Sequence, residues 1–150
     1  MARELIDDLI GRTKRAFEDL LQHTEGLTEE QATQSPHPNV KSIWECVMHV
    51  AWCKRHHADH AFGTHTVFDW DAREQVCPTF ADARRLLQDA HGEVFKHLCA
   101  LQDDRELQRT VKNPEGEQVR LRQVLQTLIN HDLYHLGQLV LMRQMLGLSA

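Results

Sequence analysis

Two histidines four residues apart, His131 and His135, interrupt an apolar helical pattern near the end of the chain. They lie on one helical face, a seam whose residues are spaced alternately three and four apart: Leu121, Val124, Leu128, His131, His135, Gln138, Met142 and Met145. Side chains four residues apart lie on one face of a helix, so the two rings converge. Buried imidazoles need partners, and a transition-metal ion that both rings bind is a suitable one. The alternative is two core histidines that hydrogen-bond to their neighbours.

A two-histidine site needs a further ligand, because catalytic zinc sites usually have three protein ligands and one open position. The stretch from Ser42 to Phe62 places four donors in one strip: His49, Cys53, His56 and His60. His49 is the strongest candidate, since apolar residues flank it. Cys53 is a candidate ligand or reactive thiol, although a buried core cysteine is the commoner outcome. The polar segment that contains His56, His57 and His60 favours a solvated helix end.

Polar neighbours of the histidines have candidate supporting roles. Asp132 follows His131 as the glutamate of H-E-x-x-H follows the first zinc ligand of peptidases, which makes it a candidate catalytic residue. The alternative for Asp132 is an exposed carboxylate on the shoulder of the helix. A peptidase is disfavoured, because the common zinc peptidases have their third metal ligand downstream of the motif, and no His, Asp, Glu or Cys follows His135. Gln138, Glu45 and Cys53 are expected around the ligands, with Gln138 as a hydrogen-bond partner.

Four amphipathic stretches must position these side chains. They span residues 2–23, 42–62, about 80–101 and 121–146. Ser42 with Glu45 predicts a capping box, and Gly63 predicts the end of the second helix. Between the helices, Phe68 and Trp70 could fold a long loop back on the core, and the turn at residues 113–116 predicts a hairpin or an extended loop. We therefore predict an all-α four-helix bundle, a single domain over residues 1–150, with its cofactor site between facing helices.

Composition excludes several classes of function. The formal net charge is −5 and no stretch concentrates Lys and Arg, which argues against nucleic acid as a partner. The N-terminus mixes charged and apolar residues, so neither a signal peptide nor a membrane span is expected there. The four cysteines form no C-x-x-C pair, which suits reduced thiols and predicts a cytoplasmic protein. No serine lies in a nucleophile elbow, and no Gly-rich phosphate loop occurs.

The segment Ser42-Ile43-Trp44-Glu45 leading to His49, together with Asn130-His131-Asp132-Leu133-Tyr134-His135-Leu136-Gly137-Gln138, resembles the DinB/YfiT family of small bacterial metal-binding four-helix bundles. The resemblance covers nearly the whole chain. It implies one divalent ion on His49, His131 and His135. Relatives include thiol-dependent S-transferases, a thiol-dependent isomerase, metal-dependent hydrolases and members without a known reaction, so the resemblance implies the fold and the site more narrowly than the activity.

We therefore expect a metal-dependent thiol S-transferase or hydrolase that acts on a small electrophilic molecule. Zn or Ni is the expected ion, and Fe, Mn and Co are alternatives. A low-molecular-weight thiol is a candidate second cofactor, and the expected pocket lies at one end of the bundle, beside the Phe68–Trp70 loop. Two other classes stay open: a non-catalytic stress-response protein that a metal staples together, and a homodimeric interaction module without metal.

Overall fold

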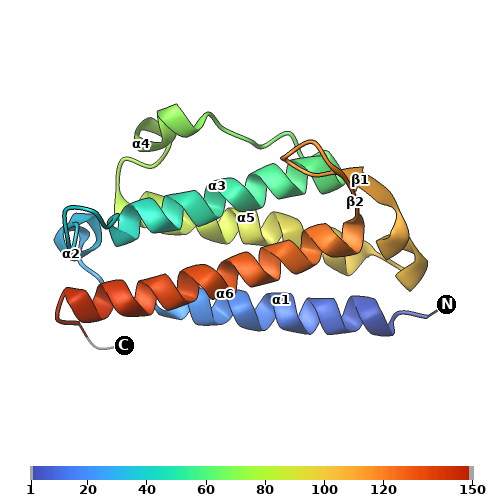
Figure 1. Ribbon diagram of the computed structural model, residues 1–150, viewed down its shortest axis with the longest axis horizontal. Helices are drawn as coiled ribbons and strands as arrows, with labels where there is room; N and C mark the ends of the chain where they lie inside the picture. The colour runs from blue at the N-terminus through green and yellow to red at the C-terminus, as the bar shows by residue number, and fades with distance from the viewer. Residues whose placement is uncertain (1, 149–150) are drawn as a thin grey trace.

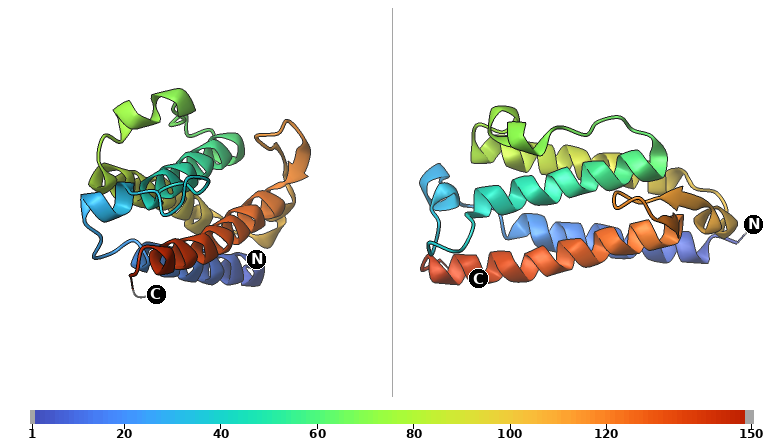
Figure 2. Two further views of the ribbon diagram at one scale, coloured as in Figure 1. Left: turned by 60° about the vertical axis from the view of Figure 1, so that its left-hand side comes forward. Right: turned by 45° about the horizontal axis from the view of Figure 1, so that its top comes forward.

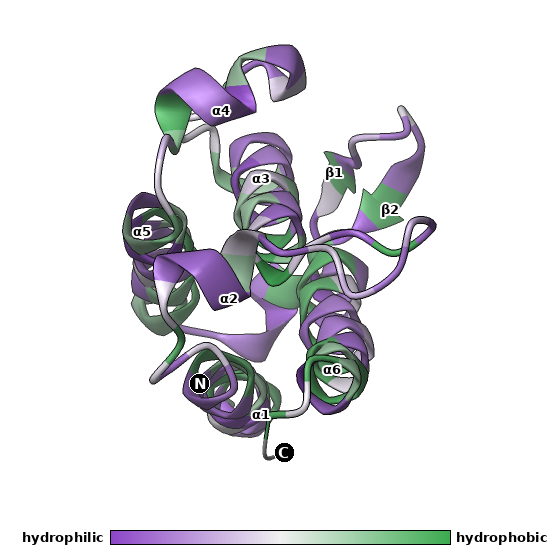
Figure 3. Cartoon of the chain, turned by 90° about the vertical axis from the view of Figure 1, so that its left-hand side faces the viewer, coloured by the Kyte–Doolittle hydropathy of each residue, from purple (hydrophilic) through white to green (hydrophobic). Residues whose placement is uncertain are grey.

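Four long helices dominate the computed structural model, which describes residues 2–148: α1 (Glu4–Gln22), α3 (Ile43–Phe62), α5 (Phe80–Ala100) and α6 (Leu121–Met145). They lie side by side along the long axis of the molecule (Figure 1). α1 packs on α5 and α6, and α3 packs on the same two helices, so α1 and α3 occupy opposite corners (Figure 3). The predicted all-α four-helix bundle is confirmed.

The connections differ in length because α3 and α5 begin at the same end of the bundle. The segment between them runs back along α3 and contains a 3-10 turn (Trp70–Ala72) and α4 (Arg73–Val76) (Figures 1 and 2). It is held by the Trp52 indole, which donates to the carbonyl of Phe68 over 3.0 Å. The short helix α2 (Glu29–Thr33) belongs to the connection between α1 and α3. After the 3-10 turn Asp104–Gln108, strands β1 (Thr110–Lys112) and β2 (Gln118–Arg120) form an antiparallel hairpin that leads into α6.

The ends of α3 follow from local sequence. The Ser42 hydroxyl accepts the Glu45 amide proton over 3.2 Å, and Gly63 ends the helix at φ 67°, a left-handed conformation that glycine adopts without strain. The Glu45 carboxylate does not return to the backbone of Ser42, so the cap has only one of the two bonds of the predicted capping box. These ends place His49 in the second turn of α3.

The core consists of two apolar clusters, one in each half of the bundle. One contains Phe17, Val47 and Leu87, and the other contains Leu9, Val94 and Leu125. Polar side chains from α1, α3 and α6 are buried between them, namely Thr13, Lys54 and Asp132. The helices thus meet at mid-length through polar groups, whose desolvation has to be offset by hydrogen bonds and ion pairs.

The buried face of α6 is rotated from the predicted seam. In its second half, the buried residues are Asp132, His135, Leu139 and Met142, whereas Gln138 and Met145 are exposed. The predicted stripe therefore lies at the edge of the core, where it faces a pocket. The sequence did not reveal this, because the spacing of apolar residues alone does not distinguish a pocket wall from a core. Within the described residues, no helix combines the length and the apolar character needed to cross a membrane.

Candidate metal centre

His49 of α3 and the two histidines of α6 converge between the helices. The ring centroids of His49 lie 5.3 Å from His131 and 4.9 Å from His135, and the two α6 rings are 4.4 Å apart. The Nε2 atoms of His131 and His135 are separated by 3.1 Å. The spacing of four residues thus brings the two α6 rings together, and the packing of α3 against α6 adds the third.

Burial keeps these rings neutral. Burial, followed by the positive charge of neighbouring histidines and lysines, lowers the pKa of His49 to about 4 and that of His131 to about 3. Burial also lowers the pKa of His135. A neutral imidazole has a free nitrogen lone pair, which is the form that binds a metal ion.

A hydrogen bond to Gln138 sets the tautomer of His135. Gln138 Oε1 lies 2.7 Å from His135 Nδ1, so this nitrogen donates its proton and Nε2 is left as the free donor atom for a ligand. Gln138 Nε2 in turn donates to the Tyr134 hydroxyl over 3.3 Å, which orients the amide. The exposed Gln138 therefore determines which nitrogen of the buried His135 ring has the free lone pair.

The Nε2 pair of His131 and His135 fits a divalent transition-metal ion. Two nitrogens bound to one tetrahedral ion at about 2.0–2.1 Å lie about 3.3 Å apart, close to the Nε2 separation of His131 and His135. Two free lone pairs at this distance repel each other unless a proton or a cation lies between them. The remaining nitrogen of His131, Nδ1, is buried and has no protein partner. Three imidazoles are ligands that Zn, Ni, Fe, Mn and Co all accept.

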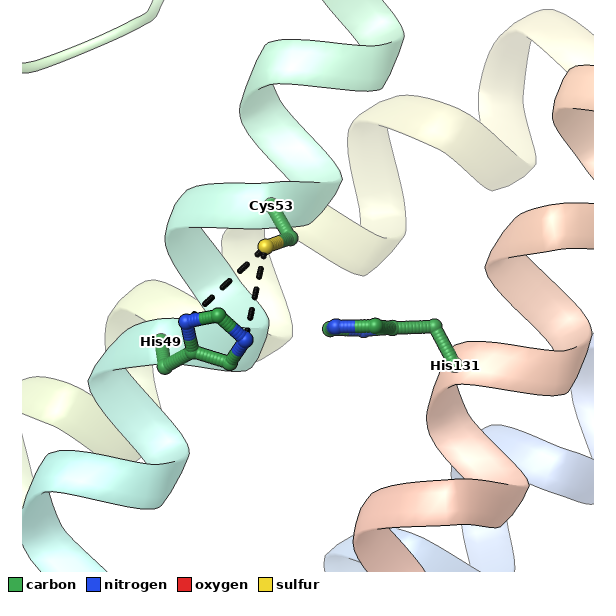
Figure 4. A group of neighbouring side chains, drawn as sticks. All are labelled: His49, Cys53 and His131. Atoms are coloured by element: carbon green, nitrogen blue, oxygen red, sulfur yellow. Dashed lines mark hydrogen bonds between the residues drawn. The ribbon is translucent and has the colours of Figure 1, made fainter. Parts of the chain in front are cut away.

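Two cysteines border the same rings. His49, Cys53 and His131 offer donor atoms that all lie within 4.8 Å of one another, and Figure 4 shows the α3 pair facing His131 across the gap between the helices. Cys53 Sγ is 3.7 Å from His49 Nε2, and Cys46 Sγ is 3.6 Å from His135 Nδ1. Burial raises the pKa of Cys46 to about 12 and that of Cys53 to about 11, so both are thiols. All four cysteines of the chain are free.

The other α3 histidines lie outside this cluster of donors. His56 stacks on His60 with centroids 6.4 Å apart, and the Trp52 ring lies 4.4 Å from His56. His57 Nδ1 hydrogen-bonds to the carbonyl of Cys53 over 2.8 Å. All three are half-buried, so the expectation of a solvated helix end is only partly met.

Asp132 is buried, which makes the alternative of an exposed carboxylate wrong. It is 1% exposed, and its Oδ2 accepts a hydrogen bond from Lys54 Nζ over 2.7 Å, while Oδ1 has no partner. Burial raises the pKa of Asp132, and the nearby Lys54 ammonium opposes that rise. The carboxylate thus pairs with α3 and does not hydrogen-bond to either α6 histidine, and its catalytic role stays a prediction.

Glu45 lies one turn before His49 on α3. Its carboxylate makes no hydrogen bond to a candidate ligand in the described part of the chain, so its supporting role also stays a prediction.

A pocket of about 620 Å³ opens onto the three rings. Its walls come from the segment before α3 and from the second half of α6, and they comprise Asn39, Val40, Lys41, Cys46, His49, His131, Tyr134, His135, Gln138, Leu141, Met142 and Met145. The predicted border by the Phe68–Trp70 loop is wrong for this pocket. That loop does pack on the bundle, and Trp70 meets His49 edge-on at 5.9 Å, but none of residues 68–70 lines the pocket.

Two lysines were not foreseen as part of this region. Lys54 lies on the apolar stripe of α3, four residues after Val50 and four before Ala58, and this position was a signal of burial in the sequence. Lys41 lines the pocket from a connecting segment, where no periodicity indicates which way a side chain points.

Comparisons with known proteins agree with this geometry. A search of curated proteins finds no match. Among solved structures, a DinB-like protein from Bacillus cereus ATCC 10987 superposes with a TM-score of 0.80 at 17% identity, covering 95% of this chain and 93% of that one. YfiT from Bacillus subtilis, described as a probable metal-dependent hydrolase with an unusual four-helix bundle topology, has a TM-score of 0.76 at 19% identity, with 99% and 91% coverage. A conserved protein from Enterococcus faecalis has a TM-score of 0.71 at 16% identity, with 93% and 95% coverage. At these identities the likeness concerns the fold.

The family model described as the DinB superfamily matches residues 12–139, a span that contains all three candidate histidines. Because this match covers most of the chain, the protein belongs to the DinB superfamily.

Proposed function

We propose that this protein is a metal-dependent enzyme, a hydrolase or a thiol S-transferase, that acts on a small electrophilic molecule. The observation that carries the proposal is the convergence of His49, His131 and His135, all held neutral, on the floor of an open pocket. The description of the structurally similar YfiT as a probable metal-dependent hydrolase supports the same class of activity.

In this proposal, residues of the chain bind the metal ion, orient its ligands and hold the substrate. His49, His131 and His135 hold one divalent ion, and Gln138 holds the proton of His135 on Nδ1. Bound there, a divalent ion would supply a nucleophile near neutral pH by lowering the pKa of water or of a thiol. The pocket walls seat the substrate beside that position.

One observation favours a second candidate, a non-catalytic protein in which a bound metal ion holds α3 and α6 together. Cys53 lies within the cluster of donors, and a fourth protein ligand would close a tetrahedral site to water and substrate. A Cys53→Ser variant separates the two candidates. An enzyme with an open site keeps its metal and its activity, whereas a closed His₃Cys site loses metal affinity.

Metal content of untagged protein tests the proposal. We expect about one ion per wild-type chain after dialysis, measured by elemental analysis, and less than about a tenth of that in His49→Ala and His135→Ala. His60→Ala is the matched control, because it removes a histidine of the same helix outside the cluster. Full metal content in His135→Ala would overturn the three-histidine assignment. Loaded wild-type protein that neither hydrolyses electrophilic esters nor transfers thiols would favour the stapled protein.

A further inference from the structure

The pocket has walls of two chemical kinds. Much of the wall formed by α6 is apolar, and three of its side chains are exposed large hydrophobic groups: Tyr134 at 65%, Leu141 at 56% and Met145 at 44%. Together with Met142 and Val40, they border a volume of about 620 Å³, which suits a small organic ligand. An apolar surface next to a polar floor indicates a ligand with an apolar body.

The opposite rim contributes positive charge. Among the described residues, Lys41 is the one Lys or Arg that lines the pocket, and no Asp or Glu lines it, although the whole chain has 22 acidic residues. Lys41 is exposed and makes no ion pair or hydrogen bond within residues 2–148. Its charge contributes to the lowered pKa values of His49 and His135, so its field reaches the pocket floor.

We propose that the pocket binds a small amphipathic organic anion, whose acidic group pairs with Lys41 and whose apolar body packs on Leu141, Met142 and Met145. The inference rests on the proposed function for the reaction at the histidines, and it adds the class of substrate. An ammonium on the rim of a pocket that has no carboxylates in its lining discriminates between a charged ligand and its neutral isostere.

Octanoate and its neutral isostere octanamide test the charge recognition. Their Kd values are measured by NMR titration of the full chain, both metal-depleted and metal-loaded, because a carboxylate also binds metal ions directly. In the metal-depleted protein we expect octanoate to bind about five- to tenfold more tightly than octanamide. Lys41→Gln should reduce this preference to less than about twofold. Lys96→Gln, which removes an exposed lysine of α5 that forms no ion pair within the described residues, should preserve it.

Leu141→Asn tests the apolar wall. Because Leu141 is exposed, the variant should fold, and it should weaken octanoate and octanamide by the same factor, about three- to tenfold. Circular dichroism of each variant verifies folding.

The proposal is overturned if octanamide binds as tightly as octanoate, if Lys41→Gln retains the preference, or if neither probe binds. A preference that appears only in metal-loaded protein and is independent of Lys41 also overturns it, since the carboxylate then binds the ion and the metal site stands alone. If the chain takes up no metal but the preference depends on Lys41, the proposed function fails and the anion pocket stands.

Discussion

The hydrogen bond between Gln138 and His135 joins an exposed side chain to a buried candidate ligand, so it can be altered without disturbing the core. Gln138 Oε1 accepts the Nδ1 proton over 2.7 Å and thereby directs the Nε2 lone pair toward His131. A ligand whose tautomer and orientation are set in advance binds a metal more tightly.

We predict that Gln138→Leu lowers the affinity for Zn²⁺ about tenfold, because His135 loses the acceptor that selects its tautomer. Gln138→Glu should restore wild-type affinity or exceed it, since a carboxylate is a stronger acceptor. Competition titration against a chromophoric chelator measures both. Gln144→Leu, a second exposed glutamine of α6, is the control. Equal affinities in wild type and Gln138→Leu would show that Gln138 does not orient the ring.

At the scale of the elements, Lys54 and Asp132 join α3 to α6 next to the candidate metal centre. Their charged atoms are 2.7 Å apart, and their side chains are 1% and 2% exposed. The Lys54 ammonium also lies 5.5 Å from the centre of the Phe17 ring, which links it to α1. Removing one partner leaves a buried, uncompensated charge, whereas removing both leaves an apolar contact.

Lys54→Met should therefore lower the free energy of unfolding by about 3–5 kcal/mol, and the double variant Lys54→Met/Asp132→Leu should recover most of this loss. Urea denaturation of metal-depleted protein measures the effect without a contribution from metal binding. The exposed pair Lys14–Glu18, 3.9 Å apart, provides the control, and Lys14→Met should change stability by about 0.5 kcal/mol or less. A double variant as unstable as Lys54→Met would refute this account.

Replacing a glycine by alanine is expected to change stability in opposite directions at Gly63, which ends α3, and at Gly92, which lies within α5. Gly63 has φ 67°, where a Cβ is strained, so Gly63→Ala should destabilise the protein by about 1 kcal/mol. Gly92 lies within α5, and an added Cβ there meets no atom within 4 Å, so Gly92→Ala should stabilise by about 0.5–1 kcal/mol. Thermal unfolding of both variants checks the two signs. A stabilising Gly63→Ala would contradict the left-handed cap.

The sequence predicted the elements better than it predicted their partners. Ser42 and Gly63 mark the ends of α3 because caps depend on local chemistry, and the turn at residues 113–116 marks the hairpin for the same reason. The spacing of His131 and His135 predicted that the rings would meet. By contrast, Lys54 and Asp132 find each other only when α3 packs on α6, and the pocket wall at Lys41 depends on how an irregular segment folds. Such pairings between distant segments are not encoded in the periodicity of either one.

At the scale of the whole molecule, the polar layer at mid-length extends to α5 through His91. The His91 ring stacks on Phe17 with centroids 3.6 Å apart, and its Nδ1 is buried without a partner. Burial, together with the charge of Lys54, lowers the pKa of His91 to about 3. The folded protein therefore holds a neutral imidazole where the unfolded chain, with an ordinary histidine pKa near 6.5, takes up a proton in mild acid.

This difference makes stability depend on pH with a definite sign. Between about pH 6.5 and pH 3 this histidine binds more protons in the unfolded chain than in the folded one, so its contribution makes the free energy of unfolding fall as pH falls. Each histidine of this kind contributes a slope of at most about 1.4 kcal/mol per pH unit. His91→Phe keeps the stack on Phe17 and removes the titrating group, so its stability should fall less steeply between pH 6.5 and 4.5, while the two proteins should show parallel behaviour above pH 7. Urea denaturation of metal-depleted protein at several pH values measures the two slopes. Identical slopes would mean that His91 is protonated in the folded bundle, and that the layer between the two apolar clusters accommodates a second positive charge beside Lys54.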